Sequence, residues 1–167
     1  MTPLKQLSPA AIPRALEKAE RYRLLNQPWA AESICLDILA TEPGHQKAIR
    51  MLLLALTDQF GVQLAGGVER AREVLARLSS DYERAYYAGI ICERRAKAQL
   101  DRRAPGAGFI AYEWLREAMS WYEKAEGIRP EGNDDALLRW NTCARMLSDS
   151  PHIVPRPEET AAPAFGE

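Results

Sequence analysis

The chain has 167 residues and a formal net charge of −1, from 22 Lys or Arg against 23 Asp or Glu. This balance gives no overall electrostatic attraction to nucleic acid or to an anionic membrane surface, so neither is expected as a partner. Apolar residues make up 47% of the chain and charged residues 27%, which is ordinary for a globular protein. We therefore expect about one domain with a hydrophobic core.

Apolar residues recur at helical spacing along most of the chain. Stripes begin at Ala31, Val68, Ala111 and Ala136, and each continues at steps of three or four residues, as on one face of a helix. No convincing strand pattern is found. The sequence therefore predicts an all-α fold with about seven helices, over residues 9–26, 29–41, 45–59, 67–79, 81–101, 109–126 and 133–147.

Proline and glycine separate the predicted helices. Breaks are expected at residues 26–28, 42–44 and 129–132, each of which contains a proline. Gly61 and the pair Gly66-Gly67 predict a loop before the fourth helix. Gly106 and Gly108 predict a flexible connection over residues 103–108, because glycine interrupts regular structure.

Two segments share one spacing of residues that ends in a proline. The first set is Ala31, Cys35, Ile38 and Pro43, and the second is Ala118, Tyr122, Ala125 and Pro130. Both sets are separated by steps of 4, 3 and 5 residues. Ala19 and Leu53, on either side of the first set, are 34 residues apart, the period of tetratricopeptide repeats. Small residues at Ala19 and Gly89 would let antiparallel helices approach closely.

On these residues the chain resembles the tetratricopeptide-repeat family over roughly residues 12–147. It departs from the family pattern in the middle, where Glu83 stands in place of the proline, and at Trp140, which replaces a small residue. The resemblance implies stacked antiparallel helical hairpins, about three of them, followed by a capping helix. We expect this repeat domain to span residues 1–147.

Residues 148–167 form a proline-rich acidic tail. They contain four prolines and few apolar residues, so we expect the tail to be disordered. The alternative is that the tail, with Phe165 as its anchor, docks in a groove of the same molecule or of a neighbour.

No arrangement typical of a catalytic or metal site is found. His45 and His152 are 107 residues apart, whereas zinc ligands come in short paired spacings. Cys35, Cys92 and Cys143 are far apart and fall in apolar surroundings, where cysteine behaves as a small hydrophobe. We therefore expect a protein that is not an enzyme and that needs no metal or cofactor.

Arg94, Arg95 and Lys97 form a basic patch that, together with Arg102 and Arg103, is the one local excess of positive charge. This basic patch is either a solvated helix face or a contact for an anionic partner. Sequence-specific binding of nucleic acid is less favoured, because the chain is nearly neutral and no recognition module is evident.

Tetratricopeptide stacks commonly bind other proteins in a concave groove lined by the first helices of their hairpins. The resemblance therefore implies a set of candidate partner-binding residues, namely Arg23, Arg50, Tyr86, Asn141 and Arg145. Arginines in such a groove suit an acidic protein or peptide segment. The groove slots of the first helix hold Leu16 and Glu20, where carboxylate-clamp members of the family have Lys and Asn, so that clamp is not assigned.

The function implied by the resemblance is that of an adaptor or scaffold. Two alternatives stay open: a small chaperone of the same family for a secreted or aggregation-prone partner, and a protein that assembles into homo-oligomers. The longest aliphatic run has six residues, at 51–56, against about 20 for a membrane-spanning helix. With no signal peptide recognised and no disulfide framework, we expect a cytoplasmic protein.

Overall fold

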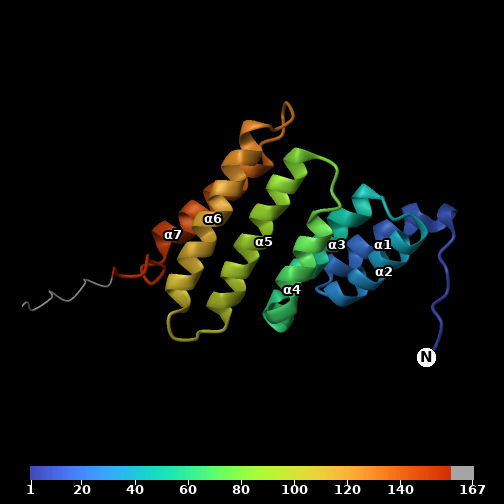
Figure 1. The fold of residues 1–167 in the computed structure, drawn as a ribbon, viewed down its shortest axis with the longest axis horizontal. Coiled ribbons are helices and arrows are strands. Elements are labelled where there is room, and N and C mark those ends of the chain that lie inside the picture. Colours follow the sequence, from blue (N-terminus) through green and yellow to red (C-terminus); the bar gives the residue numbers. More distant parts are fainter. Residues whose placement is uncertain (159–167) are drawn as a thin grey trace, which may run out of the picture.

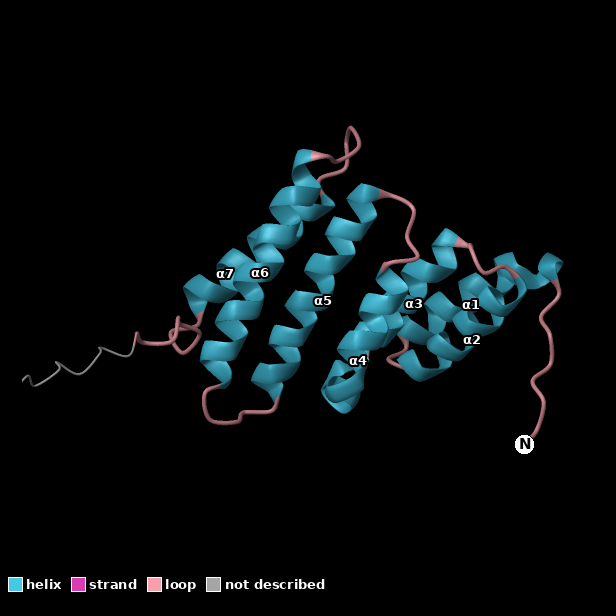
Figure 2. Cartoon of the chain, viewed as in Figure 1, coloured by secondary structure: helices cyan, strands magenta, loops and turns pink. Residues whose placement is uncertain are grey.

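The computed structural model describes residues 1–158, apart from the side chains of residues 63–65, and its regular structure is helical throughout. The all-α prediction is confirmed (Figure 2). A short 3-10 helix at Pro9–Ala11 precedes seven α-helices in the described part of the chain. These are α1 (Ile12–Leu24), α2 (Pro28–Thr41), α3 (Gln46–Asp58), α4 (Phe60–Leu75), α5 (Asp81–Asp101), α6 (Ala107–Gly127) and α7 (Asp135–Asp149).

The helices pack in chain order. Each helix contacts the next one from α1 to α7, and α3 also contacts both α1 and α5. Figure 1 shows the resulting row, with the N-terminal helices at one end and α7 at the other. No helix in residues 1–158 combines the length and apolarity that crossing a bilayer requires.

The helix boundaries follow local chemistry that the sequence already indicated. Pro28 begins α2, where proline's missing N–H is not needed. Ser80 caps α5, its hydroxyl accepting a hydrogen bond from the Glu83 N–H at 3.2 Å. Gly106 has a φ of +78° just before α6, a conformation that glycine adopts without steric cost.

One predicted loop is wrong. The sequence predicted a loop from Gly61 to Gly67, but α4 begins at Phe60 and continues through these glycines. A glycine inside a helix costs only about 1 kcal/mol relative to alanine, so packing can outweigh it. Phe60 is 1% exposed, and a Cβ on Gly67 would lie 3.2 Å from its ring. Gly67, about two helical turns after Phe60, thus leaves room for the buried phenylalanine ring.

Two hydrophobic clusters make up the core. The first is formed mainly by α1 to α4, and the second by α5, α6 and α7. Helix α5 serves both, because Ile91 belongs to the first cluster and Ile90 to the second. Tyr122 of α6 is fully buried in the second cluster and lies against Gly89 of α5, so the small residue does allow a close helix approach.

The chain after α7 returns to the start of α6. Ile153 is buried in the second cluster, and a Cβ on Gly108 would lie 3.1 Å from the backbone carbon of His152. The part of the expected tail up to residue 153 is thus packed against the helices. Residues 159–167, with the proposed anchor Phe165, lie outside the described residues.

Candidate functional site

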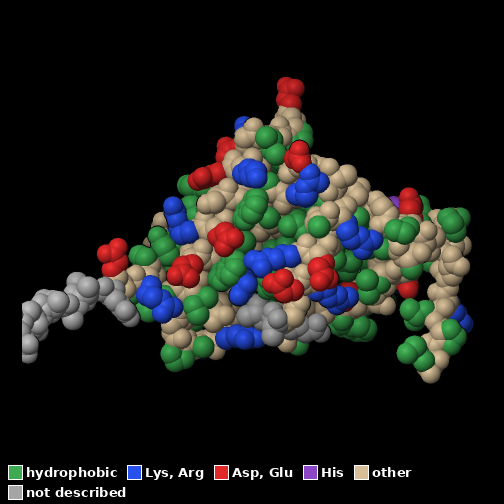
Figure 3. Space-filling view, in the orientation of Figure 1, with side chains coloured by type: hydrophobic (Ala, Val, Ile, Leu, Met, Phe, Trp, Pro, Cys, Tyr) green, Lys and Arg blue, Asp and Glu red, His purple; other side chains and the backbone are tan. Residues whose placement is uncertain are grey.

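A cleft of about 740 Å³ opens between four helices that are not consecutive in the chain. Its walls come from α1, α3, α5 and α7, with the start of α4 closing one side. Four cations and three carboxylates line it. Figure 3 shows Lys, Arg, Asp and Glu side chains mingled over the middle of one face. The cleft therefore offers charged groups of both signs to a ligand.

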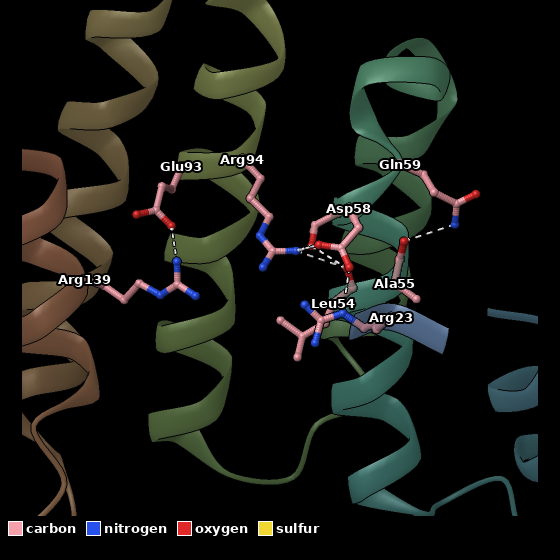
Figure 4. Close-up of polar contacts among 9 residues, drawn as sticks. Arg23, Leu54, Ala55, Asp58, Gln59, Glu93, Arg94 and Arg139 are labelled. Carbon is pink, nitrogen blue, oxygen red and sulfur yellow. Dashed lines mark hydrogen bonds and ion pairs between the residues drawn. The ribbon is translucent and has the colours of Figure 1, made fainter. Parts of the chain in front are cut away.

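One wall is built around Asp58, the last residue of α3. The Arg23 Nε of α1 donates to Asp58 Oδ2 at 2.6 Å, and Arg94 Nη1 of α5 donates to Asp58 Oδ1 (Figure 4). Burial lowers the pKa of Arg94, and the charge of Asp58 opposes that effect. Asp58 therefore connects three helices through two charge-assisted hydrogen bonds.

Arg94 has two further acceptors on α3. The same Nη1 atom donates to the Thr57 hydroxyl at 3.0 Å and to the Leu54 carbonyl oxygen at 3.2 Å. Its position is thus set by three acceptors, of which only Asp58 is charged.

The opposite wall contains the buried carboxylate of Glu93, which is 6% exposed. Arg139 Nη1 of α7 donates to Glu93 Oε2 at 2.9 Å (Figure 4), and the Tyr122 hydroxyl donates to the same oxygen at 3.2 Å. The Cys143 thiol lies 3.6 Å from Glu93 Oε1. Burial raises the pKa of Tyr122, so its hydroxyl stays a neutral donor. Glu93 is therefore fully engaged by its own protein, as a buried charge must be.

The ion pair with Glu93 keeps the Arg139 guanidinium charged. Burial works to lower its pKa, but Glu93 and the neighbouring tyrosines outweigh burial and raise it. Arg139 nevertheless keeps 34% of its side chain exposed, and it lines the cleft.

The five predicted groove residues lie in different places. Arg23 lines the cleft. Arg50 is on α3 and pairs with Glu83 of α5 at 2.9 Å, and Tyr86 of α5 is stacked on Tyr82 with ring centroids 5.9 Å apart. Neither of these two lines the cleft, nor do two predicted residues of α7, Asn141 and Arg145. From α7 the lining residues are Arg139, Thr142 and Met146.

The predicted basic patch is divided between two sides of α5. Arg94 and Lys97 line the cleft, and Lys97 is exposed. Arg95 instead lies over the ring of Trp114 in α6, with its guanidinium carbon 3.9 Å from the ring centroid. That geometry is a cation–π contact, which stabilises helix packing.

The sequence reasoning missed Asp58, Glu93 and Arg139. A signal existed for Glu93, because it directly follows the apolar run Ala88 to Cys92 and precedes buried Ala96 by one helical step. A charged residue at such a position needs a buried partner.

No family model, curated protein or solved structure matches this chain. Its resemblance to tetratricopeptide repeats therefore rests on the spacing of its own residues. In residues 1–158 no group of three His, Cys, Asp or Glu side chains is placed to hold a metal ion.

Proposed function

We propose that the chain is a non-catalytic interaction module of the tetratricopeptide type, which binds a peptide segment of another protein in the cleft. The observation that supports the proposal is which helices form the walls of the cleft. They come from α1, α3 and α5, which are the first helices of the hairpins if α1–α2, α3–α4 and α5–α6 are read as pairs, and from α7, the helix that follows the third pair. In a stack of this type those first helices form the concave side, which is the side that binds peptides in the family, and this supports the cleft as the proposed peptide site.

The chemistry of the lining favours an acidic, partly apolar peptide. Arg23, Arg94 and Arg139 each use one nitrogen in the hydrogen bonds described above, which leaves other N–H donors of each guanidinium for a ligand. The exposed ammonium of Lys97 lies on the same surface. The partly exposed Leu100 and Met146 add apolar contacts. Carboxylates and backbone carbonyl groups are the acceptors that such donors recognise.

Self-association is a second candidate, favoured by a separate observation. Apolar side chains around the junction of α1 and α2 are exposed: Leu24 by 79%, Leu25 by 60% and Trp29 by 66%. Exposed apolar clusters often mark protein contacts. Light scattering of the purified chain would show a concentration-dependent increase in mass if this surface joins two copies, and a monomer mass at all concentrations would exclude that role.

Selection from a displayed library of random peptides tests the main proposal. The full chain serves as bait, and the Lys97→Glu variant, which reverses one exposed charge of the cleft, serves for counter-selection. Lys47→Glu is the matched control, because Lys47 is also exposed but lies outside the cleft. We expect peptides that bind wild type and Lys47→Glu, and that lose about tenfold in affinity on Lys97→Glu. Peptides that bind all three proteins equally, or no enrichment at all, would overturn the proposal.

A further inference from the structure

Two arginines from different helices meet on one carboxylate in the wall of the cleft. Arg23 of α1 and Arg94 of α5 both pair with Asp58 of α3 (Figure 4). The Asp58 side chain keeps 25% of its surface exposed, so this carboxylate is in contact with solvent. It occupies one donor nitrogen of each arginine, to which an acidic group on a ligand could bind instead.

We propose that Asp58 is an internal competitor, which holds Arg23 and Arg94 until a carboxylate on a bound peptide takes its place. This inference rests on the proposed function, since it concerns the same cleft. Exchanging one carboxylate for another keeps both guanidinium charges paired, so the exchange avoids the penalty of an unpaired charge. A neutral peptide cannot make this exchange and leaves Asp58 bound. Asp58 thereby makes the cleft select for acidic segments.

The surroundings of Arg94 fit such an exchange. Its Nη1 atom is also held by the Thr57 hydroxyl and the Leu54 carbonyl oxygen. These neutral acceptors keep the guanidinium in place when Asp58 moves away, so the site for the ligand carboxylate is formed beforehand. Such preorganisation reduces the cost of binding.

The Glu93 carboxylate, in contrast, is not exchangeable. It is 6% exposed and is contacted by Arg139, Tyr122 and Cys143. Removing it would leave buried donors without partners, which is costly. Of the two carboxylates bound to arginines in the cleft, Asp58 is therefore the one that a ligand can replace.

Asp101 provides a matched control for the charge of Asp58. It lines the same cleft and is exposed, but it takes part in none of the ion pairs found among residues 1–158. Asp58→Asn and Asp101→Asn therefore change the net charge of the cleft equally, and only the first releases two arginines.

The experiment measures fluorescence anisotropy of a dye-labelled peptide that carries several glutamates around one phenylalanine. The same peptide with glutamines in their place is the second probe. Full-length wild type, Asp58→Asn and Asp101→Asn are titrated in parallel at low salt. We expect Asp58→Asn to bind the glutamate peptide about fivefold to tenfold more tightly than wild type. Asp101→Asn should stay within about twofold, and the glutamine peptide should show no gain.

Equal gains in both variants would overturn the inference, because net charge alone would then explain them. No gain in Asp58→Asn, or weaker binding, would also overturn it. If the library peptides bind the cleft while Asp58→Asn changes nothing, the inference fails and the proposed function stands; if no peptide binds any variant, both fail.

A measurement on wild type covers the case in which Asp58→Asn does not fold. The Arg23 Nε–H resonance, observed in ¹⁵N-labelled protein, reports the hydrogen bond to Asp58. We expect this resonance to shift when the glutamate peptide saturates the protein. A peptide that binds in the cleft and leaves the resonance unmoved would contradict the exchange.

Discussion

Replacing Gly89 by alanine tests whether the contact between α5 and α6 depends on this small residue. Gly89 lies inside α5, where alanine would normally stabilise the helix by about 1 kcal/mol. A Cβ at this position, however, would lie 2.6 Å from Tyr122 Cδ1 and 2.9 Å from Cζ. Ordinary contacts between carbon atoms are about 3.5–4.0 Å, so the ring or the helix has to move.

The tyrosine has little freedom to move. Tyr122 is fully buried, and its hydroxyl donates to Glu93 at 3.2 Å. Overpacking of a core costs about 1–3 kcal/mol, and a ring that is fixed at both ends places this site near the upper value. Subtracting the gain in helix propensity leaves a net loss of about 2 kcal/mol. For a chain of this size, that loss corresponds to a decrease of about 4–8 °C in Tm.

Thermal unfolding followed by circular dichroism measures the effect, with Gly66→Ala as the control. Gly66 also lies within a helix, α4, but a Cβ there would meet no atom within 4 Å. Gly66→Ala should therefore raise Tm by a few degrees. If Gly89→Ala is as stable as Gly66→Ala, the close approach of α5 and α6 at Tyr122 is refuted.

Three further predictions concern Gly108, Glu93 and the three cysteines. Gly108→Ala should displace the segment that contains Ile153, since a Cβ would press on the His152 backbone, and limited proteolysis should then cleave this segment faster than in wild type. Glu93→Gln should lower the free energy of unfolding in urea by about 1–3 kcal/mol, because Arg139 loses its charged partner; an unchanged midpoint would contradict the buried pair. Burial raises the thiol pKa to about 12 in all three cysteines, Cys35, Cys92 and Cys143, so a thiol reagent at pH 8 should label only the unfolded chain. The same shifts give stability that is complete below pH 9, the ordinary thiol value, and is lost as the pH rises toward 12. The urea midpoint should therefore fall between pH 9 and pH 11, and a constant midpoint would show that the thiols are accessible.

The helices could be predicted from the sequence because their signals are local. Apolar spacing and capping residues such as Ser80 depend only on neighbouring positions, and the structure places α2 and α5 within a residue of the predicted bounds. The start of α4 could not be predicted in this way. Its glycines are locally unfavourable, and the compensating contact between Phe60 and Gly67 depends on how the side chain packs.

The cleft was harder to predict than the helices because its pairs join distant parts of the chain. Arg23 and Asp58 are 35 residues apart, and Glu93 and Arg139 are 46 apart. Helical periodicity assigns each of these residues to a face of its own helix, but it does not tell which faces meet. Arg23 was placed in the groove on the basis of the family resemblance, whereas its partner Asp58 had no signal in the sequence.

The packing of helices in chain order bears on how the protein folds. Because most contacts join a helix to the next one along the chain, only short loops have to close before each contact forms. Chains dominated by such local contacts fold quickly, roughly in microseconds to milliseconds. The first helices can also pack on one another while later ones are still being synthesised. The pair between Glu93 and Arg139 has to wait for α7. The return of Ile153 to the start of α6 comes after α7 in the chain, so this short segment would be the last described part of the chain to pack.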